Sequence, residues 1–405
     1  MQNIKDFLNV SDAQIKHARE LHKDSIVVDN AKMGVEVWSE AQVEKLNEMM
    51  DRGRPYCEIE DTIRNMRLEE MLDPDSDTRR IYAAQIQKSG VTCTSLTQSS
   101  DTMEGSLRSL SRMHRLFENL EDIILFCSHA GDILKAKREG KIAVMLDFQN
   151  TLSIGMDLDN IDLFYDQGIR QIQLTYNLRT LAADGGTERT NAGLSHFGVA
   201  MIQKMNDLGI IVDTGHVGIR STIEAAEVSQ KPIAISHSCC RTVHAHDRCK
   251  TDDAIKAVAA RGGVIGMCAI PYFLAPIYKT DEGNKAGTLK DMLDHIDYAV
   301  ELAGIDHVGI GTDTKDRPGC PERWGEAMRI NRENSPWKGW RPEHTFDYDV
   351  NSEACIFPSP DKILAWSNWV NITIGLVSRG YSDEEIRKII GENWLRLYKE
   401  VIGEQ

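Results

Sequence analysis

Polar side chains follow the short apolar runs of this chain at the places where predicted strands end. His216 and His237 come soon after the runs 209–213 and 232–236, and Asp313 follows a third such run. Imidazoles and carboxylates are the groups that bind zinc or transfer protons in proteins. If the three strand ends meet, the sequence predicts an active site with His216, His237 and Asp313 as its catalytic residues.

The elements that would position these side chains are eight short apolar segments, separated by stretches with helical periodicity. Strands that are buried on both faces and alternate with helices indicate a parallel sheet. Eight of them fit an α/β fold of the (β/α)8 TIM-barrel type, in which the active site lies at the C-terminal strand ends. A doubly wound open sheet is the main alternative, but no glycine-rich phosphate loop follows the first strand. The predicted strands are 25–29, 90–97, 142–148, 169–175, 209–213, 232–236, 262–267 and 306–312.

Helical periodicity is clearest in four of the intervening stretches. These are 193–208, 252–261, 288–303 and 382–401, the last opening with a serine and a glutamate spaced as in a capping box. Other histidines lie in polar helical surroundings and are expected to face solvent. They are His17, His22, His114 and His129.

We expect residues 1–405 to form one barrel domain, because (β/α)8 barrels often use a long chain as a single unit. Two insertions would enlarge it, at about 35–88 and 314–360. The second follows the last strand on the active-site face and could cap the pocket over an anionic or aromatic substrate. A dimer contact or plain loop packing is the alternative. Its cationic and aromatic residues are Arg317, Trp324, Arg329, Arg332, Trp337, Trp340 and Arg341.

Charge and cysteine content limit the class of partner. The chain has 47 basic and 62 acidic residues, a net charge of −15, which argues against nucleic acid and anionic membranes. The N-terminal segment has no apolar core of signal-peptide length. The nine cysteines show no disulfide spacing, which predicts free thiols and a cytoplasmic protein, with Cys239 and Cys240 as packing groups. We expect a small-molecule substrate, and a homodimer stays open.

Long segments of the chain resemble a known family. They are FYDQGIRQIQLTYN (164–177), GLSHFGVAMIQKMNDLGIIVDTGHVG (193–218), ISHSCCRTVHAHDRCKTDD (235–253), HIDYAVELAGIDHVGIGTD (295–313) and RGYSDEEIRKIIGENWLRLYKEV (379–401). In content and order they resemble the membrane (renal) dipeptidase family of binuclear zinc peptidases, a branch of the amidohydrolase-type barrels. The resemblance extends from about residue 20 to residue 400 and implies a hydrolase acting on a dipeptide.

The resemblance also implies roles for four residues. His216 and His237 align with the histidines that complete the second zinc site of the family. Arg248 aligns with the arginine that binds the C-terminal carboxylate of the substrate. Asp313 aligns with the aspartate that handles the catalytic proton.

Departures from the family pattern are concentrated at the metal site. Ala31 and Met33 stand where the family has the His-x-Asp ligands of the first zinc. Gln149 stands in place of the glutamate that bridges both zincs, and Tyr176 in place of a histidine that contacts the substrate. Asn30 occupies a glycine position of the family motif. We expect Asn30, Gln149 and Tyr176 to bind the substrate together with the aligned arginine.

These departures predict that binuclear zinc is absent. A two-metal hydrolase needs bridging carboxylates to offset the charge of its ions, and alanine and methionine do not hold zinc. At most one zinc would remain at His216 and His237, with Gln149 as a weak third ligand unless Asp29 or Asp313 joins them. The cofactor is therefore expected to be none or a single zinc.

Three functions remain open at this point. The first is a dipeptidase-like hydrolase with at most one metal, acting on a small dipeptide or N-acyl amino acid. The second is a metal-independent enzyme that uses Asp313 with His216 or His237 as acid and base on a different small carboxylate-bearing substrate. The third is a non-catalytic binding protein, which would have no need for the aspartate and both histidines.

Overall fold

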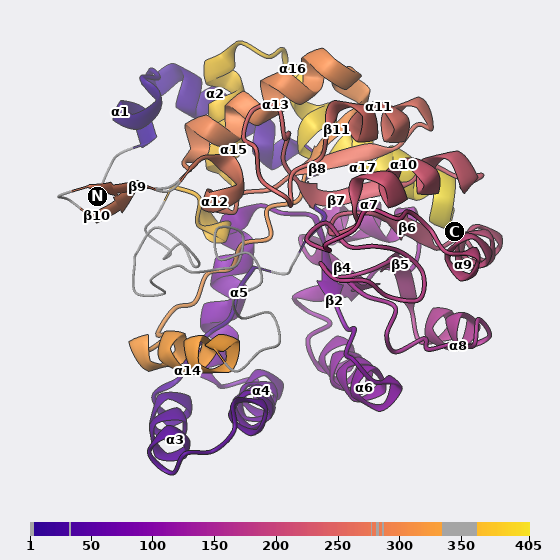
Figure 1. Cartoon of the computed structure of the whole chain (residues 1–405). Coiled ribbons are helices and arrows are strands. Elements are labelled where there is room, and N and C mark those ends of the chain that lie inside the picture. The colour runs from indigo at the N-terminus through magenta and orange to yellow at the C-terminus, as the bar shows by residue number, and fades with distance from the viewer. Residues whose placement is uncertain (1–3, 32–33, 277, 281–282, 286, 334–362) are drawn as a thin grey trace.

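A parallel barrel occupies the centre of the molecule. The computed structural model describes residues 4–31, 34–276, 278–280, 283–285, 287–333 and 363–405. Within these residues, eight parallel strands follow one another in the order β1-β2-β4-β5-β6-β7-β8-β11 (Figure 1). They are β1 (Val28–Asp29), β2 (Cys93–Thr97), β4 (Ile142–Phe148), β5 (Ile169–Gln173), β6 (Ile211–Asp213), β7 (Ala234–Ser238), β8 (Val264–Met267) and β11 (Val308–Ile310).

The first and last strands meet just beyond β1, where Asn30 N–H donates to the carbonyl of Ile310 at 3.1 Å. This contact brings the two ends of the sheet together, so the fold is the predicted (β/α)8 barrel. Seven of the eight predicted strands contain an observed strand, and the eighth, 232–236, overlaps β7, which extends two residues further to Ser238. A further short strand, β3 (Ile124–Phe126), pairs with β4 outside the barrel order and was not predicted.

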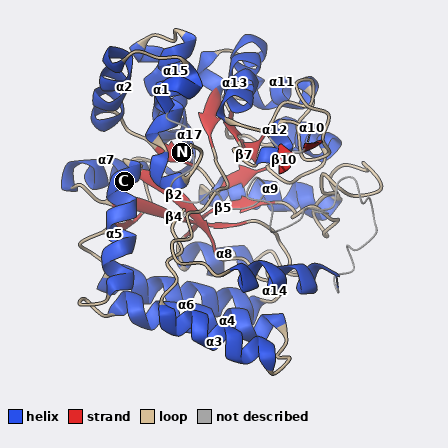
Figure 2. Ribbon diagram, turned by 90° about the vertical axis from the view of Figure 1, so that its left-hand side faces the viewer, coloured by secondary structure: helices blue, strands red, loops and turns tan. Residues whose placement is uncertain are grey.

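Helices surround the strands, as Figure 2 shows. They include α2 (Asp12–Asp24), α6 (Met103–Asn119), α7 (Ala130–Glu139), α8 (Asn160–Asp166), α9 (His196–Leu208), α10 (Ile219–Val228), α11 (Asp252–Ala260), α13 (Leu289–Ala303) and α15 (Val370–Arg379). Smaller elements are α1 (Ile4–Leu8), α12 (Pro271–Leu274), the hairpin of β9 (Tyr278–Thr280) and β10 (Gly283–Lys285), and the 3-10 turns Ile305–His307 and Trp366–Asn368. No helix in the described residues is long and apolar enough to cross a membrane.

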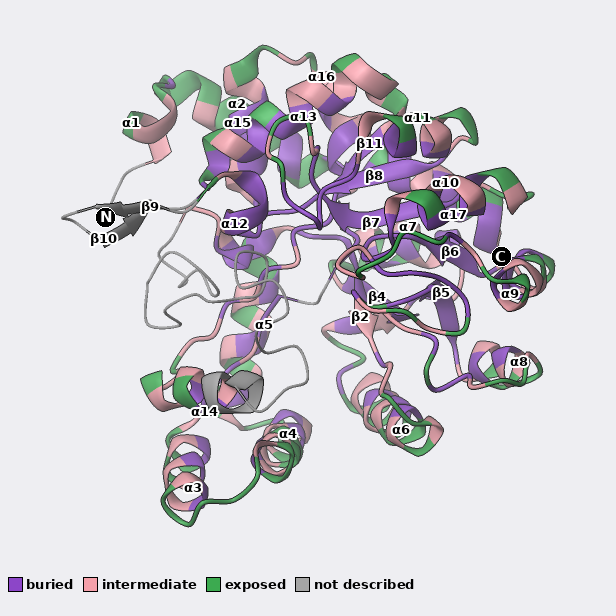
Figure 3. Ribbon diagram, in the orientation of Figure 1, coloured by how far each residue is buried: buried purple, intermediate pink, exposed green. Residues whose placement is uncertain are grey.

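The C-terminal helix closes the end of the barrel at which the strands begin. Alternate strand residues pack against Trp394 and Tyr398 of α17 (Asn393–Ile402), among them Val28, Met145 and Ile211. The intervening strand residues face the surrounding helices, since side chains alternate along a strand. The strands are accordingly buried, whereas the outer faces of the helices are exposed (Figure 3). With one end filled by aromatic rings, the polar strand exits are left at the other end.

The predicted helix 382–401 is interrupted rather than uniform. It consists of α16 (Asp383–Arg387), a π-helical turn (Lys388–Glu392) and α17. Its start has the predicted capping box, in which Ser382 N–H and Oγ–H both donate to Glu385 Oε2 at 2.8 Å. The wide turn brings Gly391 so close to β1 that a Cβ there would lie 2.1 Å from the carbonyl oxygen of Ile26. Glycine therefore permits the helix to pack against the first strand.

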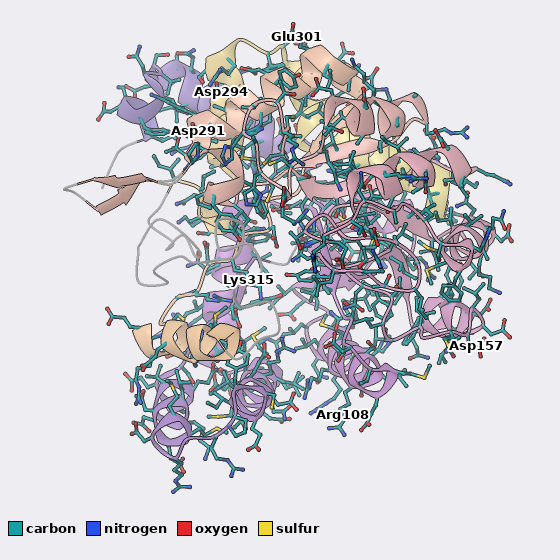
Figure 4. All side chains as sticks on the ribbon, viewed as in Figure 1. Arg108, Asp157, Asp291, Asp294, Glu301 and Lys315 are labelled. Carbon is teal, nitrogen blue, oxygen red and sulfur yellow. The ribbon has the colours of Figure 1, made fainter. Side chains whose placement is uncertain are left out.

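The segment 35–88 forms α3 (Glu40–Asp51), α4 (Tyr56–Leu72) and α5 (Asp77–Ser89). Helices α3 and α4 pack with α14 (Glu322–Glu333), and Trp38 and Trp324 belong to the apolar cluster that they form. The three helices lie apart from the barrel strands (Figure 1). Lys315, labelled in Figure 4, lies between this cluster and the barrel. Residues 334–362, including Trp337, Trp340 and Arg341, lie outside the described residues, so the predicted lid stays a prediction.

One histidine prediction was wrong. His22 was expected in solvent but is only 4% exposed. Its Nε2–H donates to the carbonyl of Ser89 at 2.9 Å, and its Nδ1 accepts from the hydroxyl of Thr373 at 2.9 Å. The packing of α15 against α2 and the contact with Ser89 at the end of α5 bury the ring, and this burial lowers its pKa to about 4.

Candidate functional site

His216 and His237 meet at the C-terminal end of the barrel. Their Nε2 atoms are 2.8 Å apart and their rings are nearly perpendicular, at 68°. His216 follows β6, and His237 lies within β7, which carries an irregularity between Ile235 and Ser238. Both side chains are buried. Two strand exits that are separate in the sequence are thus joined in one polar pair.

Hydrogen bonds on the far side of each ring decide where its protons lie. His216 Nδ1 is 2.6 Å from Asn177 Oδ1, which can only accept, so this nitrogen carries a proton. His237 Nδ1 is 2.8 Å from Ser236 Oγ, whose own proton is donated to Asp213 at 2.6 Å, so Nδ1 donates here too. Both Nε2 lone pairs then face each other. A cation between them, either a proton or a metal ion, removes this repulsion.

Asn177 and Gln173 hold His216 in this orientation, and neither was predicted as a site residue. Asn177 has φ +58°, in the left-handed region that is uncommon for residues other than glycine. Gln173 Oε1 accepts the backbone N–H of His216 at 3.0 Å, and its Nε2 donates to the carbonyl of Gln149 at 2.7 Å. Position 215 has room only for a glycine, because a Cβ there would lie 2.8 Å from Gln173 Oε1. For Gln173 and Asn177, the sequence signal is their position at and just after the end of β5.

Tyr176 covers one face of the histidine pair. Its ring stacks on His216 with centroids 4.1 Å apart and planes 27° from parallel. The residue is 38% exposed, so its ring lies between the pair and solvent. This position suits a residue that contacts a bound molecule, and the substrate-binding role of Tyr176 stays a prediction.

Arg248 lies beside the pair on the loop after β7. It is buried, its Nη1–H donates to the carbonyl of Gly215 at 2.5 Å, and its guanidinium lies 5.2 Å from the centre of the Phe273 ring. Its Nη2 has no hydrogen-bond partner within the described part of the chain. A buried N–H group without a partner is costly, so this edge of the guanidinium is suited to bind a carboxylate.

Asp313 follows β11 on the same side of the barrel. Gly311, two residues earlier, is so close to β7 that a Cβ would meet the Cβ of His237 at 3.3 Å. Asp313 itself has φ +54°, again in the left-handed region. The chain therefore turns sharply at this aspartate, directly after the strand that borders His237.

Asn30 and Gln149 contribute amides at other strand exits. Asn30 is fully buried, and neither polar atom of its side chain has a hydrogen-bond partner among the described residues. Gln149 is half-buried, and the hydroxyl of Ser99 accepts its backbone N–H at 3.1 Å. Their roles in substrate binding stay predictions.

The donor set for a metal is small. Asp29 is not available, because its carboxylate accepts four hydrogen bonds, two of them from Thr312 at 2.6 and 2.7 Å. Burial raises the pKa of Asp29 to about 6, an effect that these donors oppose. Ala31 is buried and offers no ligand, and Met33 lies outside the described residues. Across those residues, no group of three or more His, Cys, Asp or Glu side chains could hold a metal ion.

The two cysteines that directly follow β7 are packing groups, as predicted. Cys239 and Cys240 are fully buried. Burial raises the pKa of both thiols. They are therefore not activated as nucleophiles.

A parallel eight-stranded barrel with a buried histidine pair and an arginine at its C-terminal strand ends defines the class of protein: a (β/α)8 barrel with a polar site at the strand exits. The chain belongs to the membrane dipeptidase family, peptidase family M19, whose sequence model matches residues 15–332. The resemblance found in the sequence is thereby confirmed.

Individual relatives are more distant. An uncharacterized dipeptidase of Schizosaccharomyces pombe is 30% identical over 222 residues, which are 54% of this chain and 52% of that protein. Dipeptidase tcpJ of Claviceps purpurea is 23% identical over 302 residues, 74% of this chain and 60% of that protein. The chain thus matches between half and three fifths of the length of these curated relatives. The structure of an amidohydrolase from Pseudomonas aeruginosa, 26% identical, superposes with a TM-score of 0.70 over 96% of this chain and 99% of that one.

Proposed function

We propose that this protein is a dipeptidase-like hydrolase that acts on a small dipeptide or N-acyl amino acid. The observation that carries the proposal is the link between Arg248 and the histidine pair. Arg248 donates to the carbonyl of Gly215, the residue before His216, and keeps one N–H group open. A carboxylate bound there would place the neighbouring amide bond beside the two imidazoles. Membership of the dipeptidase family supports the same reaction.

The reaction can be assigned to side chains as follows. Arg248 holds the carboxylate of the substrate, and His216 and His237 would hold a cation that supplies positive charge near the carbonyl oxygen. Asp313 takes a proton from water as the water oxygen bonds to the carbonyl carbon. The same proton passes to the amine nitrogen as the C–N bond breaks. Acid and amine are then the two products.

We further propose that the binuclear zinc mechanism is lost and that at most one metal is retained. Two imidazoles bound to one tetrahedral zinc would have their nitrogens roughly 3.3 Å apart, given Zn–N bonds of about 2.0–2.1 Å. The observed 2.8 Å would have to open for a single ion to fit. Such an ion would polarise the carbonyl of the substrate. Asp29 and Ala31 contribute no ligand for a second ion.

A metal-independent enzyme is the second candidate, and the short distance within the pair favours it. A separation of 2.8 Å is that of an N–H···N hydrogen bond, so a shared proton fits without movement. Asp313 with His216 or His237 would then act as acid and base, on a different small carboxylate-bearing substrate. In both candidates Arg248 binds the carboxylate of the substrate. They differ in the cation between His216 and His237, which is a metal ion in the first and a proton in the second.

The anchor is tested by Arg248→Ala in a screen of dipeptides and N-acyl amino acids, run with and without added zinc. A charge-assisted bond to a carboxylate contributes about 1.5–3 kcal/mol, so KM should rise roughly 10- to 100-fold, with a smaller change in kcat. Arg241→Ala is the matched control, because Arg241 lies on the same loop but pairs with Asp247 at 3.3 Å. Its KM should stay at the wild-type value.

Two results would count against the proposal. An unaltered KM in Arg248→Ala would refute the anchor. Binding of a carboxylate compound without turnover of any substrate would indicate a non-catalytic binding protein instead.

We also propose a reducing compartment, the cytoplasm, for this protein. The cysteines within the described residues are all free, and most are buried in the core. Buried free thiols are typical of proteins kept under reducing conditions.

A further inference from the structure

The seam between the first and last strands of the barrel contains a buried carboxylate that the proposed reaction does not use. Asp29 ends β1 and is fully buried. Its Oδ1 accepts from the backbone N–H of Thr312 at 2.7 Å, and its Oδ2 accepts from the hydroxyl of Thr312 at 2.6 Å. Two indole N–H groups complete the set, from Trp366 at 3.0 Å and Trp369 at 3.1 Å.

These contacts make Thr312 a fixed point in the chain. Its backbone and side-chain donors both point to Asp29, and its carbonyl accepts the N–H of Ala269 at 2.9 Å from the end of β8. Its hydroxyl oxygen also accepts from the hydroxyl of Thr314 at 3.1 Å. The next residue is Asp313, whose φ of +54° requires a neighbourhood that holds the turn in place.

We propose that Asp29 is a positioning residue that fixes Thr312 and through it sets the orientation of Asp313. The inference rests on the proposed function only in giving Asp313 the proton-transfer role. A carboxylate is needed because four donors converge on Asp29, and among neutral or anionic side chains only an ionised acid accepts all of them without presenting a hydrogen of its own. An asparagine would direct N–H groups at some of these donors.

A purely structural role for Asp29 would make different predictions, and the chain offers a matched control. Asp316 is a second buried carboxylate that holds the same C-terminal segment, accepting from the backbone N–H of Trp366 at 2.9 Å and of Ser367 at 2.7 Å. It makes no hydrogen bond to Thr312 among the contacts of the described residues. Loss of either carboxylate should loosen the segment around Trp366, but only loss of Asp29 should remove the hydrogen bonds that hold Thr312.

The test compares Asp29→Asn with Asp316→Asn in the full-length enzyme, using turnover and hydrogen exchange of the peptide that contains Thr312. We expect kcat to fall roughly 10- to 100-fold in Asp29→Asn, since small misplacement of a reacting group has effects of this size. KM should stay within about twofold, because Arg248 is untouched. Exchange at Thr312 should rise in Asp29→Asn and stay slow in Asp316→Asn.

A second pair of variants guards against misfolding of Asp29→Asn. Thr312→Val removes the hydroxyl donor and should lower kcat, whereas Thr312→Ser keeps it and should restore most of the activity. Equal kcat and equal exchange in Asp29→Asn and Asp316→Asn would overturn the proposal. If Asp313→Asn itself left turnover unchanged, the proton-transfer role would be wrong, and the exchange of Thr312 would still decide whether Asp29 fixes this turn.

Discussion

At the scale of single residues, uncharged side chains determine the state of the histidine pair. Asn177 accepts the Nδ1 proton of His216, and Ser236 accepts that of His237, so both Nε2 atoms present lone pairs to each other. The strand-exit position predicted both histidines from the sequence. It did not predict Asn177 or Ser236 as their partners, because these hydrogen bonds depend on side-chain orientation and on local turns such as the one at Asn177.

Asn177→Ala should uncouple His216 from this arrangement. Without the amide acceptor, the proton of His216 can move to Nε2, which would remove one lone pair from the site. We expect roughly a tenfold or larger loss of kcat, as is found when partners that orient a histidine are removed. Nitrogen chemical shifts of the ring would report the proton position directly. Asn191→Ala is the control, because Asn191 lies on the same loop but its Oδ1 accepts the backbone N–H of Arg220 at 2.9 Å.

A wild-type ring spectrum in Asn177→Ala would contradict this explanation. So would a spectrum of the wild-type protein that showed the proton of His216 on Nε2 and none on Nδ1. Either result would mean that the contact at 2.6 Å does not determine the tautomer.

At the scale of the elements, hydrophobic periodicity predicted the eight barrel strands and the main helices. It missed β3, because the three residues Ile124–Phe126 are too short for a pattern to appear. It also placed His22 in solvent, since α2 is mostly polar and only the packing of distant helices buries the ring. Local sequence therefore predicts which elements form, whereas burial of single polar residues depends on contacts between distant segments.

His22 makes stability depend on pH. Burial lowers its pKa to about 4 in the folded protein, against 6.5 for the ordinary side chain, so the folded state favours the neutral ring. As the pH falls from 6.5 to 4, the unfolded chain binds a proton that the folded protein does not bind. The free energy of unfolding should therefore decrease by about 3 kcal/mol across this window.

Urea unfolding at several pH values measures this effect. His22→Gln removes the titrating group, so its free energy of unfolding should fall less steeply than that of the wild type between pH 6.5 and 4. Equal slopes in the two proteins would show that another group causes the acid sensitivity.

At the scale of the whole molecule, most acids of the described residues lie at the surface, although six aspartates are buried. The acids Asp157, Asp294 and Glu301, labelled in Figure 4, are exposed on the loop before α8 and on α13. The site combines Arg248, the histidine pair and Asp313, and Asp29 beside it is engaged by four donors. The net charge of −15 therefore gives no measure of metal-binding capacity at the strand ends.

The metal content of active enzyme tests the central claim most directly. Protein purified without chelator is analysed for zinc and assayed for turnover, before and after chelation. We predict at most one zinc per chain, because His216 and His237 are the imidazoles that meet at the strand ends within the described residues, and Asp29 and Ala31 offer no ligand for a second ion. Two zinc ions per chain, with activity lost when they are removed and restored when both return, would contradict the claim.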